Sequence, residues 1–502
     1  MSAPGPRRWW ALAAMVASLL VLGFDMTILN VALPTMAEQL GATTGEQQWM
    51  ADGYVVVFAA LMLPAGLVGD RFGRRRMLVT GLGIFLAGSV LGALAGDVTT
   101  VIAARAAMGV GAAFVMPLGM AVVPSLFSAE ERAKAVGIVT AASALGLPLG
   151  PVVGGWLLDH FWWGSVFVVN IPMVAIGITA CLFLLPETRD PASPRVGALA
   201  TALTAGGLGT LIYGIIEAPV RGWTDPVVLA ALATGAALIT VLVVREKRSA
   251  RPMLDLALLA DRPFLLNTLT VTLAMFVLAG LMFVLPPYLQ AVLGNDALGT
   301  GLRILPMMGG LVVAAKGSGP LAERFGARAV IVAGLVVLAF AGFLGSRITV
   351  GGGYGFTAVW LSVAGLGFGF SMVPAMTAAI DALPPDRAGS GSGLLTTVRQ
   401  VGSAVGIALI GSLLAAVYEN RLPADAPEAA GDSVVAAHLL GDPALTAAAD
   451  AAYVRGMGVV LLVCGIAALV TALLAAALLP KPRKALVPGA PDVAPAAADA
   501  RQ

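Results

Sequence analysis

Charged residues are scarce in this sequence. Only 12% of the 502 residues are Asp, Glu, Lys or Arg, whereas 59% are hydrophobic. An ordinary soluble domain contains about 25% charged residues. The composition therefore excludes such a domain and predicts a chain that places much of its apolar surface against lipid.

Cysteine and histidine are almost absent. Cys181 and Cys464 both lie in apolar runs, which argues against a disulfide framework or a metal cluster. His160 and His438 fall between apolar runs, and no metal-ligand spacing surrounds them. A membrane-embedded enzyme would need buried His or Ser/Lys chemistry, or metal ligands, so the sequence disfavours that class.

The sequence also lacks a strong net charge and a nucleotide-binding loop. The net charge of +2 is too small to indicate nucleic acid as a partner. No G-x-x-x-x-G-K-[ST] loop is present, which excludes a self-contained ATP-driven pump.

The apolar residues gather in long runs. A helix needs roughly 20 of them to cross a hydrocarbon core. Fourteen such runs predict an all-α integral membrane protein with 14 transmembrane helices. The expected spans are 10–33, 49–69, 77–95, 100–124, 135–157, 165–185, 196–216, 227–244, 265–286, 299–319, 329–346, 356–380, 391–417 and 456–479.

Basic residues are divided unevenly between the loops. One set of alternate loops and both termini hold 22 of the 30 Lys and Arg residues, while the opposite loops hold only Arg221, Arg347, Arg421 and Arg455. Because basic loops remain in the cytoplasm, we expect both termini there. An even number of helices requires both termini to lie on the same side of the membrane, so the two inferences agree.

Two of the cytoplasmic loops resemble each other. GLVGDRFGRR at 66–75 aligns with GPLAERFGAR at 319–328, each after the second helix of a six-helix half. Such parallel repeats are typical of transporters whose substrate site lies between the halves.

The spans and the repeat together divide the chain into five expected segments. These are a cytoplasmic N-terminus at 1–9, a first six-helix bundle at 10–186, two inserted helices with linkers at 187–262, a second six-helix bundle at 263–480 with a polar, mobile outer loop at about 418–455, and a disordered tail at 481–502.

Two charges lie deep within expected spans of the first half. Counting along the helices places Asp25 about 8 Å and Arg105 about 9 Å from the outer edge. An intramembrane charge is costly, is usually paired and is usually functional. The two residues can form a proton-binding pair, or an ion pair that only holds two helices together.

Other polar residues are weaker candidates. Arg399 and Gln400 lie roughly 13 Å deep in the span 391–417 and can line a substrate cavity. Asp52 and Tyr54 begin the span 49–69, where a position at the outer rim and a coupling role are both open. Beyond Asp25, we expect no other carboxylate deep in a span.

The fifth expected span is unusually bare. Gly146, Gly150 and Gly154 recur every four residues and let a neighbouring helix approach closely. Pro148 and Pro151 remove backbone hydrogen bonds and bend the helix. The face can serve as packing contact or as a gate between the halves.

Several motifs resemble the major facilitator superfamily, in its fourteen-helix drug:proton antiporter branch (EmrB/QacA-like). The motifs are LGFDMTILNVALP (22–34), GLVGDRFGRRR (66–76), RAAMGVGAA (105–113, with Met108 where Gln is usual), GLPLGPVVGG (146–155) and WWGSVFVVNIP (162–172). The resemblance implies the major facilitator fold of two six-helix bundles plus two inserted helices.

The resemblance also implies a function. We expect proton-coupled efflux of hydrophobic small molecules or antibiotics across the bacterial plasma membrane by alternating access. The only partners expected are the drug, protons and lipid, with no cofactor beyond the proton gradient. A dedicated exporter of one natural product, conferring self-resistance, is the alternative.

Together, the positions of the residues and the resemblance give the following expected roles. Asp25 and Arg105 couple protons; Asn30, Tyr54, Arg399 and Gln400 are cavity candidates; Gly146, Gly150, Pro151, Gly154 and Gly155 form the gate; and Gly66, Asp70, Arg71, Gly73 and Arg74 form a cytoplasmic lock. In this lock, Asp70 accepts from the amides that begin a helix near Ser390. The arginines pair with Glu130, Glu131 or anionic lipid.

Overall fold

The computed structural model describes residues 7–126, 149–189, 197–249, 256–383 and 388–479, and within these ranges the regular structure is entirely helical. The expected first half contains α1 (Arg7–Leu40), α2 (Thr44–Phe72), α3 (Arg74–Ala93), α4 (Val98–Leu126), a helix over 149–160, α6 (Ser165–Val168) and α7 (Asn170–Leu184). The expected insert contains α8 (Ala198–Arg221) and α9 (Pro226–Arg248).

The expected second half begins with the short η1 (Leu256–Ala260). It continues with α10 (Arg262–Pro287), η2 (Tyr288–Val292), α11 (Ala297–Phe325), α12 (Ala327–Gly345), α13 (Gly353–Asp381), α14 (Ala388–Glu419), α15 (Glu428–Asp432), α16 (Val434–Leu439) and α17 (Pro443–Leu478).

The described helices confirm an all-α membrane protein. Twelve are long and apolar enough to cross a membrane, and α2, bent by 52° just before Pro64, makes thirteen. The fifth expected span, 135–157, lies largely outside the described residues, although its second part is helical over 149–160. The structure therefore agrees with thirteen of the fourteen expected spans.

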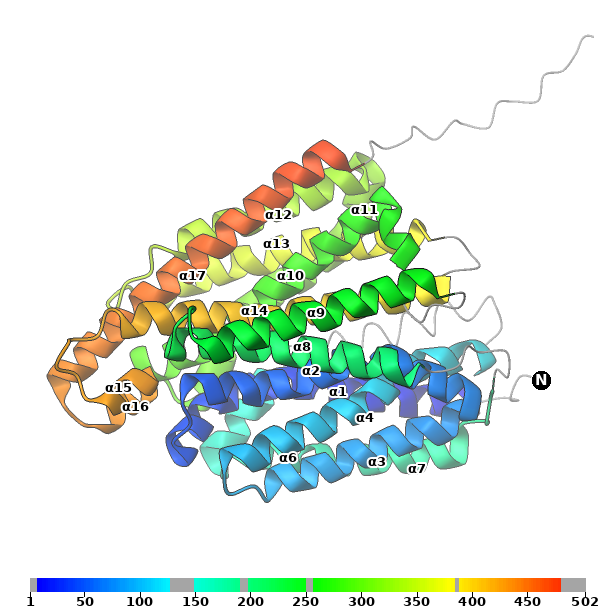
Figure 1. The fold of residues 1–502 in the computed structure, drawn as a ribbon, viewed down its shortest axis with the longest axis horizontal. Coiled ribbons are helices and arrows are strands. Elements are labelled where there is room, and N and C mark those ends of the chain that lie inside the picture. The colour runs from blue at the N-terminus through cyan, green and yellow to red at the C-terminus, as the bar shows by residue number, and fades with distance from the viewer. Residues whose placement is uncertain (1–6, 127–148, 190–196, 250–255, 384–387, 480–502) are drawn as a thin grey trace, which may run out of the picture.

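The helices form two groups joined by the insert (Figure 1). In the first group α4 packs against α2 and α3, and α1 packs against α7; in the second, α13 packs against α11 and α12, and α10 against α14. Between the groups, α2 lies along α14. The inserted α8 packs against both α2 and α14, whereas α9 packs mainly against α8.

Among the described residues, the hydrogen bonds between the two groups lie at one end of the bundle, where α1 ends and α2 begins. We call it the outer end, after the orientation that the basic loops predict. There Gln290 Nε2 donates to the carbonyl oxygen of Val31 at 2.9 Å, and the Thr44 hydroxyl donates to the carbonyl oxygen of Asp432 at 2.6 Å. The two groups are therefore held together at the outer end.

The outer loop at 418–455 differs from its expected mobile form. It contains α15, α16 and the start of α17, and α16 packs against α1 and η2. Ala430, Val434 and Ala437 are buried, and the Tyr418 hydroxyl donates to the carbonyl oxygen of Ala430 at 2.9 Å. The small apolar residues thus make the loop a folded cap, and the expectation of mobility is wrong.

Candidate functional site

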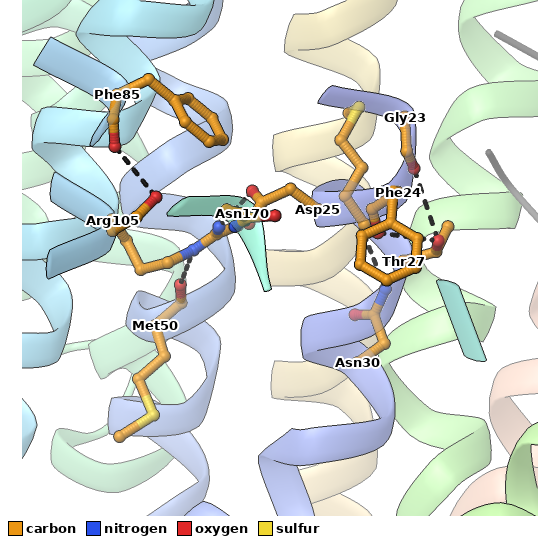
Figure 2. A network of polar contacts seen from close by, with 11 residues as sticks. Gly23, Phe24, Asp25, Thr27, Asn30, Met50, Phe85, Arg105 and Asn170 are labelled. Atoms are coloured by element: carbon orange, nitrogen blue, oxygen red, sulfur yellow. Dashed lines mark hydrogen bonds and ion pairs between the residues drawn. The ribbon is translucent and has the colours of Figure 1, made fainter. Parts of the chain in front are cut away.

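Asp25 and Arg105 form a buried ion pair (Figure 2). Asp25 lies on α1 and Arg105 on α4, and Arg105 Nη1 is 2.7 Å from Asp25 Oδ2. Each side chain is only 2% exposed. The contact predicted from their similar depths is confirmed.

Arg105 makes two further contacts, both with α2. Its Nε donates to the carbonyl oxygen of Met50 at 3.3 Å, and its guanidinium carbon lies 4.4 Å from the centre of the Tyr54 ring. A buried charge requires compensation of this kind, because removal from water costs several kcal/mol per ion. Arg105 therefore binds α1 and α2 at once.

Asn170, at the start of α7, is a site residue that sequence reasoning missed. Its Nδ2 donates to Asp25 Oδ1 at 2.9 Å, so both carboxylate oxygens have a donor (Figure 2). The available signal was its place in the motif at 162–172, but nothing in that motif identifies Asp25 as the partner. The site thus combines α1, α2, α4 and α7.

Glycine allows α2 and α4 to approach closely at the site. A Cβ added to Gly109 on α4 would lie 2.6 Å from the carbonyl oxygen of Tyr54. One added to Gly53 on α2 would contact Ile102 and Arg105 at ordinary distances. The close backbones place the Tyr54 ring against Arg105.

Tyr54 and Asp52 are not rim residues. Their exposed fractions are 1% and 0%, because α4, α8 and α14 surround this part of α2. The exposed-rim interpretation is therefore wrong, and the coupling role stays a prediction. Asp52 is a second buried carboxylate on a spanning helix, although it lies nearer the outer start of that helix than a position deep in the span.

The expected cytoplasmic lock is only partly described. Asp70 accepts from Arg74 Nε at 2.7 Å, one turn along the chain. The start of α14 follows residues outside the described ranges, and Glu130 and Glu131 themselves lie outside these ranges. Arg71 lies 6.0 Å from the Phe72 ring, and Gly66 leaves ordinary space beside Pro117. The Asp70 contact with α14 stays a prediction.

Glu187 is the observed partner of this loop. Its carboxylate accepts from the backbone amides of Arg75 and Arg76, each at 3.2 Å, at the start of α3. Gly73 has φ +122°, and a Cβ there would lie 2.6 Å from Glu187 Oε1. Glu187 thus caps α3, where a negative charge is favourable. Its separation of more than 100 residues from the loop explains why sequence reasoning missed it.

The helix at 149–160 lies between α1 and α11. A Cβ on Gly150 would collide with Thr27, and one on Gly154 would lie 2.6 Å from Ile28, both on α1. Gly155 instead faces α11, where a Cβ would lie 2.5 Å from the Leu298 Cα.

The predicted gate therefore needs a correction. Gly150 and Gly154 of its glycine repeat pack within the first group of helices, while Gly155, with Pro151 close to Gly301, contacts the second. Gly146 lies outside the described residues.

The four cavity candidates are not brought together by hydrogen bonds in the described part of the chain. Asn30 Nδ2 donates to the carbonyl oxygen of Met26 on its own helix at 3.1 Å, and Tyr54 belongs to the ion-pair site. On α14, Arg399 Nε and Gln400 Nε2 are buried and have no hydrogen-bond partner among the described residues. Their role as substrate contacts stays a prediction.

Comparison with known proteins gives a consistent picture. Residues 15–407 match the family model described as Major Facilitator Superfamily. The chain is 33% identical over 447 residues to the multidrug resistance protein Stp of Mycobacterium tuberculosis, covering 89% of this chain and 83% of that protein. It is 29% identical over 490 residues to the tetracenomycin C resistance and export protein of Streptomyces glaucescens, covering 93% and 91%.

A solved structure shows the same fold. A bacterial homologue of the human lysosomal transporter Spinster, in an inward-facing and unoccupied conformation, matches with a TM-score of 0.68 and 18% identity. The match covers 95% of this chain and 98% of that one.

Proposed function

Because the chain belongs to the Major Facilitator Superfamily, we propose that it exports hydrophobic small molecules, antibiotics among them, in exchange for protons. The family match and the transporter fold make it a multi-pass membrane transporter and not an enzyme. The names of its relatives, a multidrug resistance protein and an antibiotic resistance and export protein, support drugs as the substrate class.

The buried Asp25 site is the observation that carries proton coupling. A carboxylate with one guanidinium and one amide donor is stabilised as an anion, while its removal from water favours the neutral form. A balance of this kind can be reversed by a change in hydration or by a bound substrate. Asp25 is therefore suited to exchange a proton during transport.

The ion pair also links that proton to helix positions. When Asp25 is neutral, its attraction to Arg105 weakens, and the contacts of α1 with α4 and α7 weaken with it. Arg105 keeps its contacts with Met50 and Tyr54 on α2. In the cycle, Asp25 takes a proton from the outer side and releases it inward, and drug occupies the cavity in the opposite phase.

The direction of export depends on how the chain is inserted. We place it in the bacterial plasma membrane with both termini in the cytoplasm, because 22 of the 30 basic residues then lie on the cytoplasmic side. The proton gradient of that membrane supplies the energy, and the transporter needs no further cofactor.

A narrower substrate range is the second candidate function. It is favoured by the tetracenomycin C exporter, which aligns with 93% of this chain. Cells that express the protein can be tested against a panel of unrelated antibiotics. Resistance to one scaffold only would replace multidrug efflux with dedicated export.

Transport in inverted membrane vesicles tests the proposal. Wild type should accumulate drug in proportion to an imposed pH gradient, and Asp25→Asn should lose most of that accumulation. Glu38→Gln is the matched control, since it removes an exposed carboxylate from the same helix. Accumulation that follows a sodium gradient would overturn proton coupling, and a folded Asp25→Asn protein with normal activity would overturn the role of Asp25.

A further inference from the structure

Asp52 is a buried carboxylate with no partner in the described part of the chain. It is 0% exposed, and neither oxygen has a hydrogen bond there. One turn earlier, Gln48 Nε2 is buried and also lacks a hydrogen-bond partner within the described ranges. A buried polar group normally has a partner, so two on one helix face require an explanation.

The two side chains mark a junction of three helices. Gln48 on α2 contacts Gly411 on α14, and the Trp49 ring lies 6.4 Å from the Tyr213 ring on α8. Asp52 follows Gln48 by four residues and Trp49 by three, which places it on the α2 face between α14 and α8. The first half, the insert and the second half therefore meet beside Asp52.

The inserted α8 completes the enclosure. On α14 the Ser412 hydroxyl donates to the carbonyl oxygen of Ile215 on α8 at 2.9 Å, and both residues are buried. A Cβ added to Gly45 at the start of α2 would lie 3.5 Å from Ile216. The insert thus covers the joint between α2 and α14 and excludes water from Asp52.

Among the residues that the structure describes, no charged group forms an ion pair with Asp52. The titratable or charged groups on α2 and the helices around it include Asp25 on α1, Glu46 on α2, Arg105 on α4, Tyr213 and Glu217 on α8, and Arg399 and Glu419 on α14. Within the described residues none of these forms an ion pair or hydrogen bond with Asp52. Arg105 is held by Asp25 and contacts α2 through Met50 and Tyr54, which lie on another face of that helix from Asp52. An ionised carboxylate in such a place costs far more than a neutral one.

We propose that Asp52 is a second proton-binding residue, loaded from the outer side, and that its neutral form is required for the outer end to close against α8 and α14. The proposal rests on the proposed function, since it assigns Asp52 a step in the same transport cycle. Closing the outer end buries a proton on Asp52. Opening it admits water and lets the carboxylate ionise. The closed state binds more protons, so rising pH favours the open state.

The outer cap provides an acidic approach to this junction. The contact between Thr44 and Asp432 holds α15 over the start of α2, about 12 Å along the helix from Asp52. Burial, and then the negative charges of Glu428 and Glu46, raise the pKa of Asp432. Carboxylates of this kind attract protons to the outer entrance.

Distances between two spin labels test the proposal without substrate or gradient. Gly96→Cys and Gly351→Cys place labels on exposed outer loops of the two halves, in a background where the buried Cys181 and Cys464 are alanine. In lipid nanodiscs between pH 5 and 9, the open-to-closed ratio of the otherwise unmodified protein should rise by up to about tenfold per pH unit. The Asp52→Asn protein should lose most of this pH dependence and remain closed at the outer end. Asp52→Leu, which also removes the charge, serves the same purpose if the Asn variant folds poorly.

Two controls make the result decisive. Gly155→Val collides with the backbone of α11, so it should open the outer end at every pH and show that the labels report opening. Glu38→Gln should keep the slope of the unmodified protein. An unchanged slope in both Asp52 variants, or no slope in the unmodified protein while Gly155→Val opens, overturns the proposal. A failure of the proposed function would be detected in a different experiment, as drug accumulation in vesicles that does not depend on the pH gradient.

Discussion

Asp25 and Asp52 are equally buried but have opposite surroundings. They are 1% and 0% exposed, on adjacent helices of the first half. Asp25 has Arg105 and Asn170 as donors, whereas Asp52 has no partner among the described residues. Because a nearby positive charge favours the ionised form of a carboxylate and burial favours the neutral form, we expect the two sites to favour different protonation states.

Under the two proposals above, the two carboxylates would bind protons in different phases of the transport cycle. In the described structure Arg105 and Asn170 compensate the Asp25 carboxylate. Asp52 has no such compensation among the described residues, so the second proposal assigns it a proton in this arrangement. The segment from Met50 to Tyr54 lies between them, with Arg105 on one face and α14 with α8 near the other.

The largest expected effect comes from making Asp25 resemble Asp52. Arg105→Gln leaves the Asp25 carboxylate buried without a counter-charge, which should lower the free energy of unfolding by about 3–5 kcal/mol. Titration with SDS in mixed micelles measures it. The double variant Asp25→Asn/Arg105→Gln should regain most of that loss without regaining gradient-driven export. An Arg105→Gln protein as stable as wild type would mean that the pair contributes nothing in this structure.

The converse change at Asp52 should have the opposite sign. Asp52→Leu removes a polar group that lacks a partner, so it should stabilise the outer-closed protein by about 1–3 kcal/mol. The same titration, with Asp25→Leu beside it, gives the contrast, because Asp25→Leu should destabilise. If both variants destabilise equally, the distinction between the two carboxylates fails.

A smaller effect is expected at Asn170. Asn170→Ala leaves one Asp25 oxygen without a donor, and an interhelical hydrogen bond in a membrane contributes about 1 kcal/mol. Unfolding in SDS measures the loss. Asn30→Ala is the matched control, since among the described residues the Asn30 amide bonds only to its own helix, and its loss should cost less.

The smallest effect concerns the outer cap above Asp52. The raised pKa of Asp432 means that the folded cap binds protons more strongly than an unfolded segment. The cap should therefore exchange amide hydrogen more slowly at acid pH than at neutral pH, after correction for intrinsic exchange rates. Asp432→Asn should reduce this difference across α15 and α16. A pH dependence that survives the substitution would assign it to other groups.

The sequence predicted the Asp25–Arg105 contact because helix geometry is regular. The rise per residue placed both charges at similar depth, and a buried charge needs a partner. The contact of Asn170 with Asp25 was not predicted, because nothing in the sequence around one amide near a helix start identifies a partner 145 residues away. The ion pair was accessible from local rules, but the network around it was not.

Asp52 and the outer cap show the limit of local reasoning. The position of Asp52 near the start of a span suggested a rim, but α8 and α14, more than 140 residues further on, enclose it. The loop at 418–455 read as polar, yet its alanine and valine residues bury against α1 and η2. In both cases packing between distant segments decides the outcome.

Proton movement driven by drug tests the central claim most directly. Purified protein in proteoliposomes, with a pH-sensitive dye inside and no initial pH gradient, is given an outward or inward gradient of drug. Wild type should move protons against the drug flux, and Asp25→Asn should move drug with little or no proton countermovement. Proton movement of wild-type size in a folded Asp25→Asn protein would contradict the account.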